Sequence, residues 1–297
     1  MKKIFYIIAL GIALAGCSNN EDELLSTGSF PEDHVIRVIT EVNEPLSRAG
    51  YDVTNLERFG LMIRNSENAA YNYHKQMIGS GSSWSTSDGQ QMLWDAERTP
   101  VTMIAYAPFM SEATPDASLA VNALTNQSTE ENVKSSDFLL MKATVDPEQD
   151  LTADGKLKIS LNHAMSKLII KITVNGTTDA SMSKLGDMAI NGAVVKATCD
   201  LSAAAPVVVP AADAVVATVA PYKGTESCEC ILPPQKIAEG FSVNFSYDGK
   251  LYIWTAKEAI ELEEGVEHTL TLNVNTTVRL AAKIARNWAT GQLIDRN

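Results

Sequence analysis

The sequence has few of the residue types that usually carry out catalysis or bind metals. Its 297 residues include four histidines and four cysteines, and none of them falls in an HExxH, CxxC or mixed Cys/His spacing. Neither a GxSxG motif nor a Gly-rich phosphate loop is present. Acidic pairs such as Glu263-Glu264 are typical of solvated charge rather than of paired catalytic carboxylates. We therefore expect no enzyme activity, no metal site and no cofactor.

Basic and aromatic residues are also scarce. The 24 lysines and arginines are outnumbered by 36 acidic residues, which gives a formal net charge of −12. An acidic surface repels phosphate groups, and this argues against nucleic acid and anionic lipid as partners. Aromatic residues make up 6% of the chain. The tryptophans, which could line a glycan site but are better explained by core packing, are Trp84, Trp94, Trp254 and Trp288.

The N-terminus carries the pattern of a bacterial lipoprotein signal peptide. Lys2 and Lys3 precede an apolar run, Ile4–Leu14, that is shorter than the ~20 residues of a transmembrane helix. Small residues then lead directly to Cys17, as at the cleavage site of a secretory signal. The pattern predicts that residues 1–16 are removed and that Cys17 is lipidated, with acyl chains such as palmitate as the membrane anchor. An ordinary signal peptide with an incidental cysteine is the alternative.

The residues that follow predict a tether. Residues 17–33 are polar, acidic and rich in turn formers. Their acidic run, Ser18–Glu23, resembles the signal that sends lipoproteins of Bacteroidota-type bacteria to the outer face of the outer membrane, although solvated linkers have a similar composition. We therefore expect an outer membrane lipoprotein exposed at the cell surface.

Beyond the tether, the pattern predicts strands almost throughout. Residues 34–42 are rich in β-branched side chains, and residues 157–161 alternate between apolar and polar. Asp248-Gly249 is typical of a two-residue hairpin turn. Short strands at this spacing, without long amphipathic helices, favour an all-β fold of antiparallel sandwiches. The Ala/Val/Pro tract at residues 202–220 has no assignable structure.

Length and composition indicate more than one domain. The predicted mature chain, roughly 280 residues long, is too long for one small sandwich. A turn-rich stretch near residues 175–186 is the expected linker. We therefore expect an N-terminal β-sandwich domain at residues 34–178 and a C-terminal one at residues 179–297.

Three cysteines follow Cys17, and their pairing stays open. Cys228 and Cys230 are two residues apart in an extended segment, so their side chains would face the same way. In an exported protein one of them could form a disulfide with Cys199. The alternative is three buried thiols.

Several short segments, in this order and spacing, resemble the fimbrillin family of Bacteroidota-type bacteria, which includes major and minor fimbrium subunits, anchors and tip proteins. The most specific segment is Asn162–Leu168, in which His163 is expected to be a packed or hydrogen-bonded structural residue rather than a catalytic one. The resemblance spans nearly the whole chain. Besides the lipoprotein signal that ends at Cys17, the segments that carry the resemblance are Ser47–Ala49, Phe59-Gly60, Ile104–Pro108, Asn162–Leu168, Leu232–Gln235, Gly265, His268–Leu272 and Asn287-Trp288.

The resemblance implies a fold and a route of assembly. Family members fold as two tandem transthyretin-like antiparallel β-sandwich domains and are exported as lipoproteins. An Arg-specific protease removes the first strand, and the exposed groove accepts a strand from a neighbouring subunit. By this resemblance, Cys17 is the lipidated residue and Arg48–Ala49 is the maturation bond, in a stretch that Pro45 and Gly50 make irregular. The alternative is that Arg48 is an ordinary loop arginine.

The C-terminal strand, residues 278–284 with the tail to Asn297, is the candidate donor; its alternative is a permanent strand of the second sandwich. The expected function is therefore a structural subunit of a cell-surface fimbrium that supports adhesion, with other fimbrial subunits as partners. The alternative is a monomeric surface lipoprotein, either a fimbrial anchor or tip or an adhesin for a glycan or host protein. The sequence leaves the stalk, anchor or tip role and the adhesion ligand open.

Overall fold

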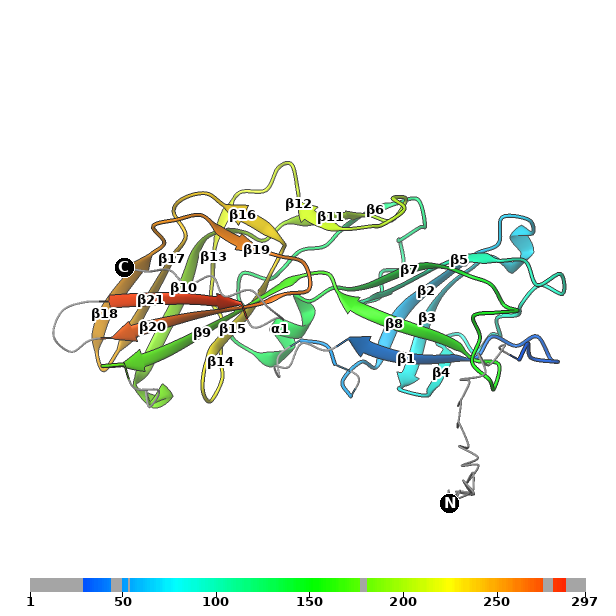
Figure 1. Cartoon of the computed structure of the whole chain (residues 1–297), viewed down its shortest axis with the longest axis horizontal. Coiled ribbons are helices and arrows are strands. Elements are labelled where there is room, and N and C mark those ends of the chain that lie inside the picture. The colour runs from blue at the N-terminus through cyan, green and yellow to red at the C-terminus, as the bar shows by residue number, and fades with distance from the viewer. Residues whose placement is uncertain (1–28, 44–49, 53, 177–180, 275–279, 287–297) are drawn as a thin grey trace, which may run out of the picture.

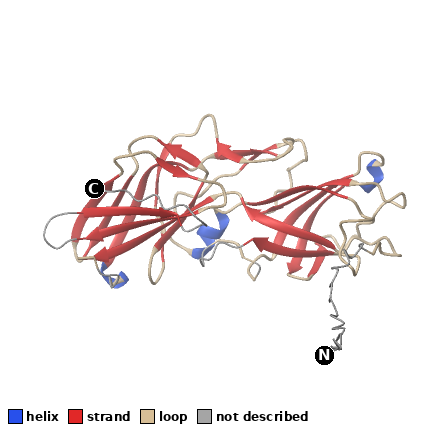
Figure 2. Ribbon diagram, in the orientation of Figure 1, coloured by secondary structure: helices blue, strands red, loops and turns tan. Residues whose placement is uncertain are grey.

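The computed structural model describes residues 29–43, 50–52, 54–176, 181–274 and 280–286. The chain is built almost wholly of strands and forms an elongated molecule with two strand-rich halves (Figures 1 and 2). The expected all-β class is confirmed. The elements are β1 (Val38–Asn43), β2 (Arg58–Arg64), η1 (Ala69–Tyr71), β3 (Tyr73–Ser80), β4 (Ser83–Thr86), β5 (Val101–Ala107), β6 (Ser118–Ala120), α1 (Glu130–Ser135), β7 (Leu139–Val145), β8 (Leu157–His163), β9 (Ser166–Val174), η2 (Met182–Lys184), β10 (Leu185–Val194), β11 (Ala197–Asp200), β12 (Val208–Pro210), β13 (Val216–Val219), β14 (Tyr222–Lys223), β15 (Cys228–Leu232), β16 (Gln235–Ile237), β17 (Ser242–Tyr247), β18 (Lys250–Thr255), β19 (Ile260–Leu262), β20 (Glu267–Val274) and β21 (Leu280–Arg286).

The N-terminal half is built on one seven-stranded sheet with the strand order β1-β8-β7-β5-β2-β3-β4. β1 and β8 run parallel, whereas the other neighbouring strands of this sheet are antiparallel. Central strands such as β5 alternate their side chains between two apolar cores, one on each face. Met103 and Ala105 join Phe59 in one core, and Ile104 and Tyr106 join the other. This sheet is therefore covered on both sides, with β1 at one edge.

The C-terminal half is a sandwich of two sheets, ordered β13-β10-β17-β18 and β14-β15-β9-β20-β21. Its core includes Ile170 from β9, Phe245 from β17 and Leu272 from β20. β9 is hydrogen-bonded to β15 and, in parallel, to β20. The domain boundary expected at residue 178 stays a prediction. β9 precedes that residue in the chain and pairs with strands of the C-terminal half. Figure 1 shows the green strand β9 among the C-terminal strands.

A small three-stranded sheet, β12-β11-β6, connects the two halves. β6 lies between two strands of the N-terminal sheet in the sequence, yet it pairs with β11, which follows β10. The tract at residues 202–220, which the sequence left unassigned, contributes β12 and β13. Val208 and Cys199 pack in the same apolar core as Tyr106 of the N-terminal sheet. The halves therefore share a core as well as a sheet.

Cys199, Cys228 and Cys230 are free and buried, which matches the alternative of three buried thiols. Cys228 and Cys230 point into the same core, as their spacing predicted. Burial in an apolar environment disfavours the thiolate, so the pKa of Cys199 is raised to about 11 and that of Cys228 to about 12. These thiols are therefore protonated and packed.

Tryptophans pack in the cores, as expected. Trp94 is buried, and Trp84 and Trp254 are partly buried against the N-terminal and C-terminal cores. Trp288 lies outside the described residues. Within the part of the chain that the structure describes, no helix has the length and apolar character needed to cross a membrane.

Candidate functional site: the edge strand β1 and the junction beside it

β1 is a strand with one neighbour in its sheet. It pairs in parallel with β8 in an unbroken register from Val38 opposite Leu157 to Asn43 opposite Asn162. Val38 and Val42 point into the N-terminal core, and Ile36 just before the strand joins them. Burial of three aliphatic side chains at ~1.5–3 kcal/mol each stabilises the docked strand by roughly 5–9 kcal/mol before ordering costs.

Polar contacts fix the register of β1 on β8. Glu41 forms an ion pair with Lys158 at 2.8 Å and accepts a hydrogen bond from the hydroxyl of Ser160. At the end of the strand, the Asn43 amide donates to Asn162 Oδ1 at 2.6 Å. The pair and the hydrogen bond from Ser160 lower the pKa of Glu41. These contacts are half exposed, so they specify alignment more than they add stability.

The opposite side of β1 is covered by the turn between β3 and β4. The backbone N–H of Thr40 donates to Gly81 O at 2.9 Å. The indole of Trp84 donates to Thr40 Oγ1 at 3.1 Å and to Gly81 O at 3.0 Å. β1 therefore lies between β8 and a hairpin turn, and its removal would expose a groove with unpaired backbone groups on β8.

Tyr51 contacts a buried polar pair, Asp137 and His163. The Tyr51 N–H donates to Asp137 Oδ2 at 3.0 Å, and His163 Nδ1 lies 2.9 Å from the same oxygen. Both side chains are almost fully enclosed, with 8% of His163 and 1% of Asp137 exposed. His163 is thus the packed, hydrogen-bonded residue that the sequence predicted.

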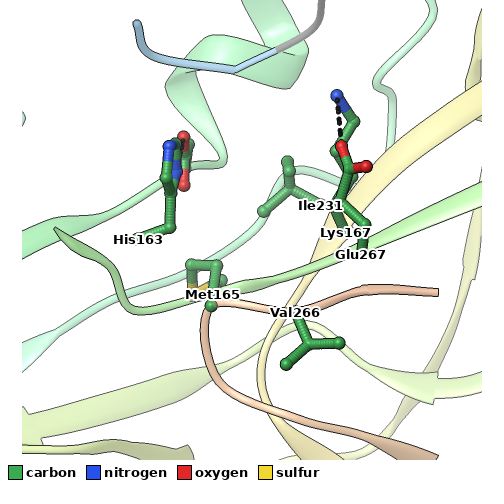
Figure 3. Close-up of a pocket in the computed structure, with 8 residues that line it drawn as sticks. His163, Met165, Lys167, Ile231, Val266 and Glu267 are labelled. Atoms are coloured by element: carbon green, nitrogen blue, oxygen red, sulfur yellow. Dashed lines mark ion pairs between the residues drawn. The ribbon is translucent and has the colours of Figure 1, made fainter. Parts of the chain in front are cut away.

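Asp137 and His163 border a small cavity between the halves (Figure 3). Its volume is about 10 Å³, the space of a single water-sized group. In Figure 3, His163 and Met165 lie to the left of Ile231, and the Lys167–Glu267 pair lies to its right. A cavity of this size has no room for an organic ligand. The residues that line it are Asp137, His163, Met165, Lys167, Ile231, Gly265, Val266 and Glu267.

Lys167 forms the second buried charge cluster of this junction. Its ammonium lies 3.0 Å from Glu229 and 3.7 Å from Glu267, and its side chain is 4% exposed. The three residues come from β9, β15 and β20, which are neighbours in one sheet. Two carboxylates around one lysine satisfy the buried positive charge and tie these strands together.

Gln127 connects the halves through its side-chain amide. Its Nε2 donates to Ile231 O at 2.8 Å, and its Oε1 accepts from Ile231 N–H at 2.8 Å. The side chain is fully buried. Sequence reasoning missed Gln127 and Asp137, because each is a single polar residue in an irregular segment without periodicity or a motif.

The predicted site residues Cys17, Arg48 and Ala49 lie outside the described residues, so their roles stay predictions. The backbone of β21 pairs antiparallel with β20 at the edge of the C-terminal sheet. The remainder of the candidate donor, before residue 280 and after residue 286, lies outside the described part. Among the described residues, no group of three or more His, Cys, Asp or Glu side chains could hold a metal ion.

Comparison with known proteins gives the chain a family. A family model for fimbrillin-like proteins matches residues 47–288, whereas no curated protein sequence matches. Two similar crystal structures are of proposed cell adhesion proteins. The one from Bacteroides uniformis is 16% identical with a TM-score of 0.62, covering 86% of this chain and 98% of that one. The one from Bacteroides ovatus is 16% identical with a TM-score of 0.64, covering 90% and 100%.

A third solved structure is similar at the level of the fold. It is the tip fimbrial protein Mfa3 from Porphyromonas gingivalis with a C-terminal truncation, at 10% identity and a TM-score of 0.50, covering 84% of this chain and 98% of that one. At such identities the structures show a shared fold, and the family assignment rests on the family model, which spans most of the chain. This protein belongs to the fimbrillin-like family.

Proposed function

We propose that this protein is a subunit of a cell-surface fimbrium that supports adhesion and assembles by β-strand exchange after proteolysis. Family membership and the fold shared with fimbrial and cell adhesion proteins support the fimbrial role. The observation that carries the mechanism is β1. It is an edge strand with buried aliphatic side chains, and a segment containing Arg48–Ala49 follows it directly.

Cleavage at Arg48–Ala49 would separate β1 from the rest of the chain. Loss of β1 leaves the edge of β8 that faced it unpaired and opens the apolar groove that holds Val38 and Val42. A strand from another subunit restores both kinds of contact, which is strand addition to a sheet edge. The partners are therefore other fimbrial subunits, either copies of this chain or related proteins.

The candidate donor is the C-terminal strand with its tail to Asn297. In the structure, β21 has one neighbour, β20, and occupies the edge of its sheet. A strand with one neighbour loses a single set of ladder hydrogen bonds when it leaves. The alternative is that β21 stays in place as a permanent strand.

Export and anchoring complete the proposal. Lipid on Cys17 would hold the precursor in the outer membrane, with the tether of residues 17–33 between the lipid and β1. Since the lipid and β1 lie on the same side of Arg48–Ala49, one cut releases the subunit from its anchor and opens the groove.

The test is the N-terminus of the protein on intact cells, determined by mass spectrometry with and without an Arg-specific protease. We expect a start at Ala49 after protease and polymers that resist dissociation on an unheated gel. Arg48→Gln is the matched variant and should retain acylated Cys17 and stay monomeric. Acylated Cys17 with no polymer in the protease-treated wild type would contradict strand exchange.

A second candidate is an anchored surface adhesin that does not polymerise. The observation that favours it is the outer face of β18, where Leu251 and Ile253 are 85% and 68% exposed. Exposed aliphatic side chains on the edge strand of a sheet are typical of a surface that meets a partner protein. This candidate predicts that lipidated Cys17 remains on the mature chain.

A further inference from the structure

β18 is an edge strand held by its sheet on one side and by the core on one face. Within the described part of the chain it pairs with β17 alone, and β21 of the facing sheet comes close to it without forming a ladder. Its inward side chains, Tyr252 and Trp254, pack against the C-terminal core. Figure 1 shows β18 at the outer end of the C-terminal half, far from β1. A contact made at β18 therefore leaves the groove of β1 accessible.

The backbone groups at the outer edge of β18 belong to the residues whose side chains are exposed. The N–H of Ala256 donates to Phe241 O at 2.9 Å, which places Ala256 in a hydrogen-bonded pair with the strand beside it. Residues of an antiparallel ladder alternate in this respect, so Leu251, Ile253 and Thr255 direct their N–H and C=O groups away from β17. Leu251 and Ile253 are 85% and 68% exposed. Donors, acceptors and aliphatic side chains thus lie along one border.

Other edge strands have features that block pairing, whereas β18 has none of these features. β12 contains Pro210, which has no N–H to donate, and β13 has a register shift against β10. β14 has two residues, and the turn between β3 and β4 covers β1. Prolines, bulges, short strands and covering loops are the usual ways in which proteins protect an edge. β18 has six residues, no proline and an unbroken register on β17. Such an edge can accept a further strand.

Charge and symmetry favour a second copy of this chain as the molecule that supplies the strand. The formal net charge of −12 makes two copies repel each other wherever acidic surfaces meet. β18 has no acidic residue, and its one charged residue, Lys250, lies at one end. Two antiparallel copies of β18 keep these lysines at opposite ends of the pair. Each strand also supplies the donors and acceptors that the other needs, as a two-fold interface requires.

We propose that β18 is a pairing site for β18 of a second copy of this chain, joined antiparallel about a two-fold axis at Ile253. Ile253 then lies opposite its counterpart, and Leu251 lies opposite Thr255 of the second copy. The four-stranded sheet continues across both molecules. The exposed aliphatic side chains of the two strands contact one another on the outer face.

This contact is weak between two single chains and strong between two polymers. One six-residue strand from each copy forms a small interface compared with the ~1,200–2,000 Å² of stable pairs. Many weak contacts made at once give a much higher total affinity. A fimbrium would present β18 on every subunit, so two fimbria would associate side by side. This last step rests on the proposed function, whereas the pairing of two single chains does not.

The first test is analytical ultracentrifugation of the full mature chain with Cys17→Ser, uncut and without lipid, over a range of concentrations. We expect an equilibrium between monomer and dimer. Ile253→Lys should weaken dimerisation at least tenfold, because it places two like charges opposite each other at the axis. Val216→Lys is the matched control and should leave the equilibrium unchanged. Val216 is 69% exposed and lies on β13, at the other edge of the same sheet.

The second test is disulfide formation, which reports the register. Opposite Cα atoms in a hydrogen-bonded antiparallel pair are ~5.5 Å apart, a distance that a disulfide can span. A mixture of Leu251→Cys and Thr255→Cys chains should therefore form linked dimers under mild oxidation faster than either variant alone. Like positions of the two copies are about 14 Å apart at ~3.4 Å per residue. The native thiols of Cys199, Cys228 and Cys230 are buried and do not compete.

Three results would overturn the proposal. The chain could sediment as a monomer up to ~1 mM, which would leave the exposed side chains of β18 to a different partner protein. Val216→Lys could weaken dimerisation as much as Ile253→Lys does, or the mixed cysteine variants could link no faster than each alone. Pairing through β18 is measured on the uncut chain, whereas strand exchange is measured after cleavage. The two proposals therefore fail through different measurements.

Discussion

At the scale of single residues, Gly60 in β2 shows how close packing fixes one side chain. A Cβ at this position would lie 2.4 Å from Cζ of Tyr106. The Tyr106 hydroxyl is held in place because it donates to Met110 O at 2.9 Å and lies 2.8 Å from His74 Nε2. The ring therefore cannot move aside without breaking these contacts, and only glycine fits beneath it.

We expect Gly60→Ala to lower the free energy of unfolding by about 1–3 kcal/mol, the usual cost of overpacking a core. Urea unfolding followed by circular dichroism measures it. The control is the same substitution in a Tyr106→Leu background, where the smaller side chain leaves room for the methyl group. An equal loss in both backgrounds would rule out the clash as the cause.

His268 makes a pH-dependent contribution at the same scale. Its Nε2 accepts a hydrogen bond from the Glu263 N–H at 3.0 Å, which requires the neutral ring. Desolvation by burial lowers the pKa of His268 to about 4, against a small opposing effect of Glu261. The native state therefore resists protonation that the unfolded chain accepts near pH 6.5.

The pKa of His268 is lower in the native state than in the unfolded chain. Its contribution to the free energy of unfolding is therefore fully present above pH 6.5 and is lost as the pH drops toward 4. The loss is about 3 kcal/mol across this window at ~1.4 kcal/mol per pH unit. Unfolding free energies at several pH values should show a shallower slope for His268→Gln than for the wild type. Parallel curves for the two proteins would contradict this role.

At the scale of elements, β1 is the strand on which the proposed strand exchange depends, and the sequence pattern predicted it. The β-branched run at residues 34–42 predicted a strand, and the structure places one at Val38–Asn43 with residues 34–36 bridged to residues 92–94. Its parallel pairing with β8 was beyond prediction, because period-two alternation reports which face is buried and not which neighbour is paired.

We expect Val38→Asp to release β1 from the groove, because a carboxylate would be placed in the core that buries Val38. Backbone amides of β1 should then exchange with deuterium at least tenfold faster. Asn43→Asp, at the exposed end of the same strand, is the matched control and should change exchange little. Unchanged protection in Val38→Asp would show that the backbone ladder alone holds the strand.

Local signals and long-range pairing account for what the sequence could and could not predict. Alternation identified β8, and the Asp248-Gly249 dipeptide identified the turn between β17 and β18. The position of β9 in the C-terminal sheet was not predicted, since it depends on partners β15 and β20 that lie over fifty residues downstream. The sequence singled out His163 through the segment that resembles the fimbrillin family. The role of Asp137 could be recognised only from the folded structure, in which it contacts His163.

At the scale of the whole molecule, the two halves are joined by more than one connection. β6 pairs with β11, and the backbone at residues 125–127 exchanges hydrogen bonds with Ala220. Gln127 adds a two-bond contact to Ile231. A fimbrium subunit under tension passes force from one half to the other, and hydrogen bonds that cross between the halves resist their separation.

Gln127 and Gln235 allow this coupling to be tested with matched substitutions. Gln235 makes the same two-bond contact, to the N–H and O of Val194 at 2.9 and 3.0 Å, but within the C-terminal half. Substitution by methionine keeps the length of each side chain and removes its amide. Each variant should lose about 1–3 kcal/mol, because a backbone N–H and C=O are left unpaired.

Calorimetry distinguishes the two contacts, because only one of them crosses between the halves. We expect Gln127→Met to split thermal unfolding into two transitions, whereas Gln235→Met should unfold at a lower temperature in the same number of steps as the wild type. If Gln127→Met retained the wild-type number of transitions, the shared core and the β6–β11 pairing would be sufficient to couple the halves. Cooperative unfolding of the two halves would then depend on the apolar contacts between them rather than on the amide of Gln127.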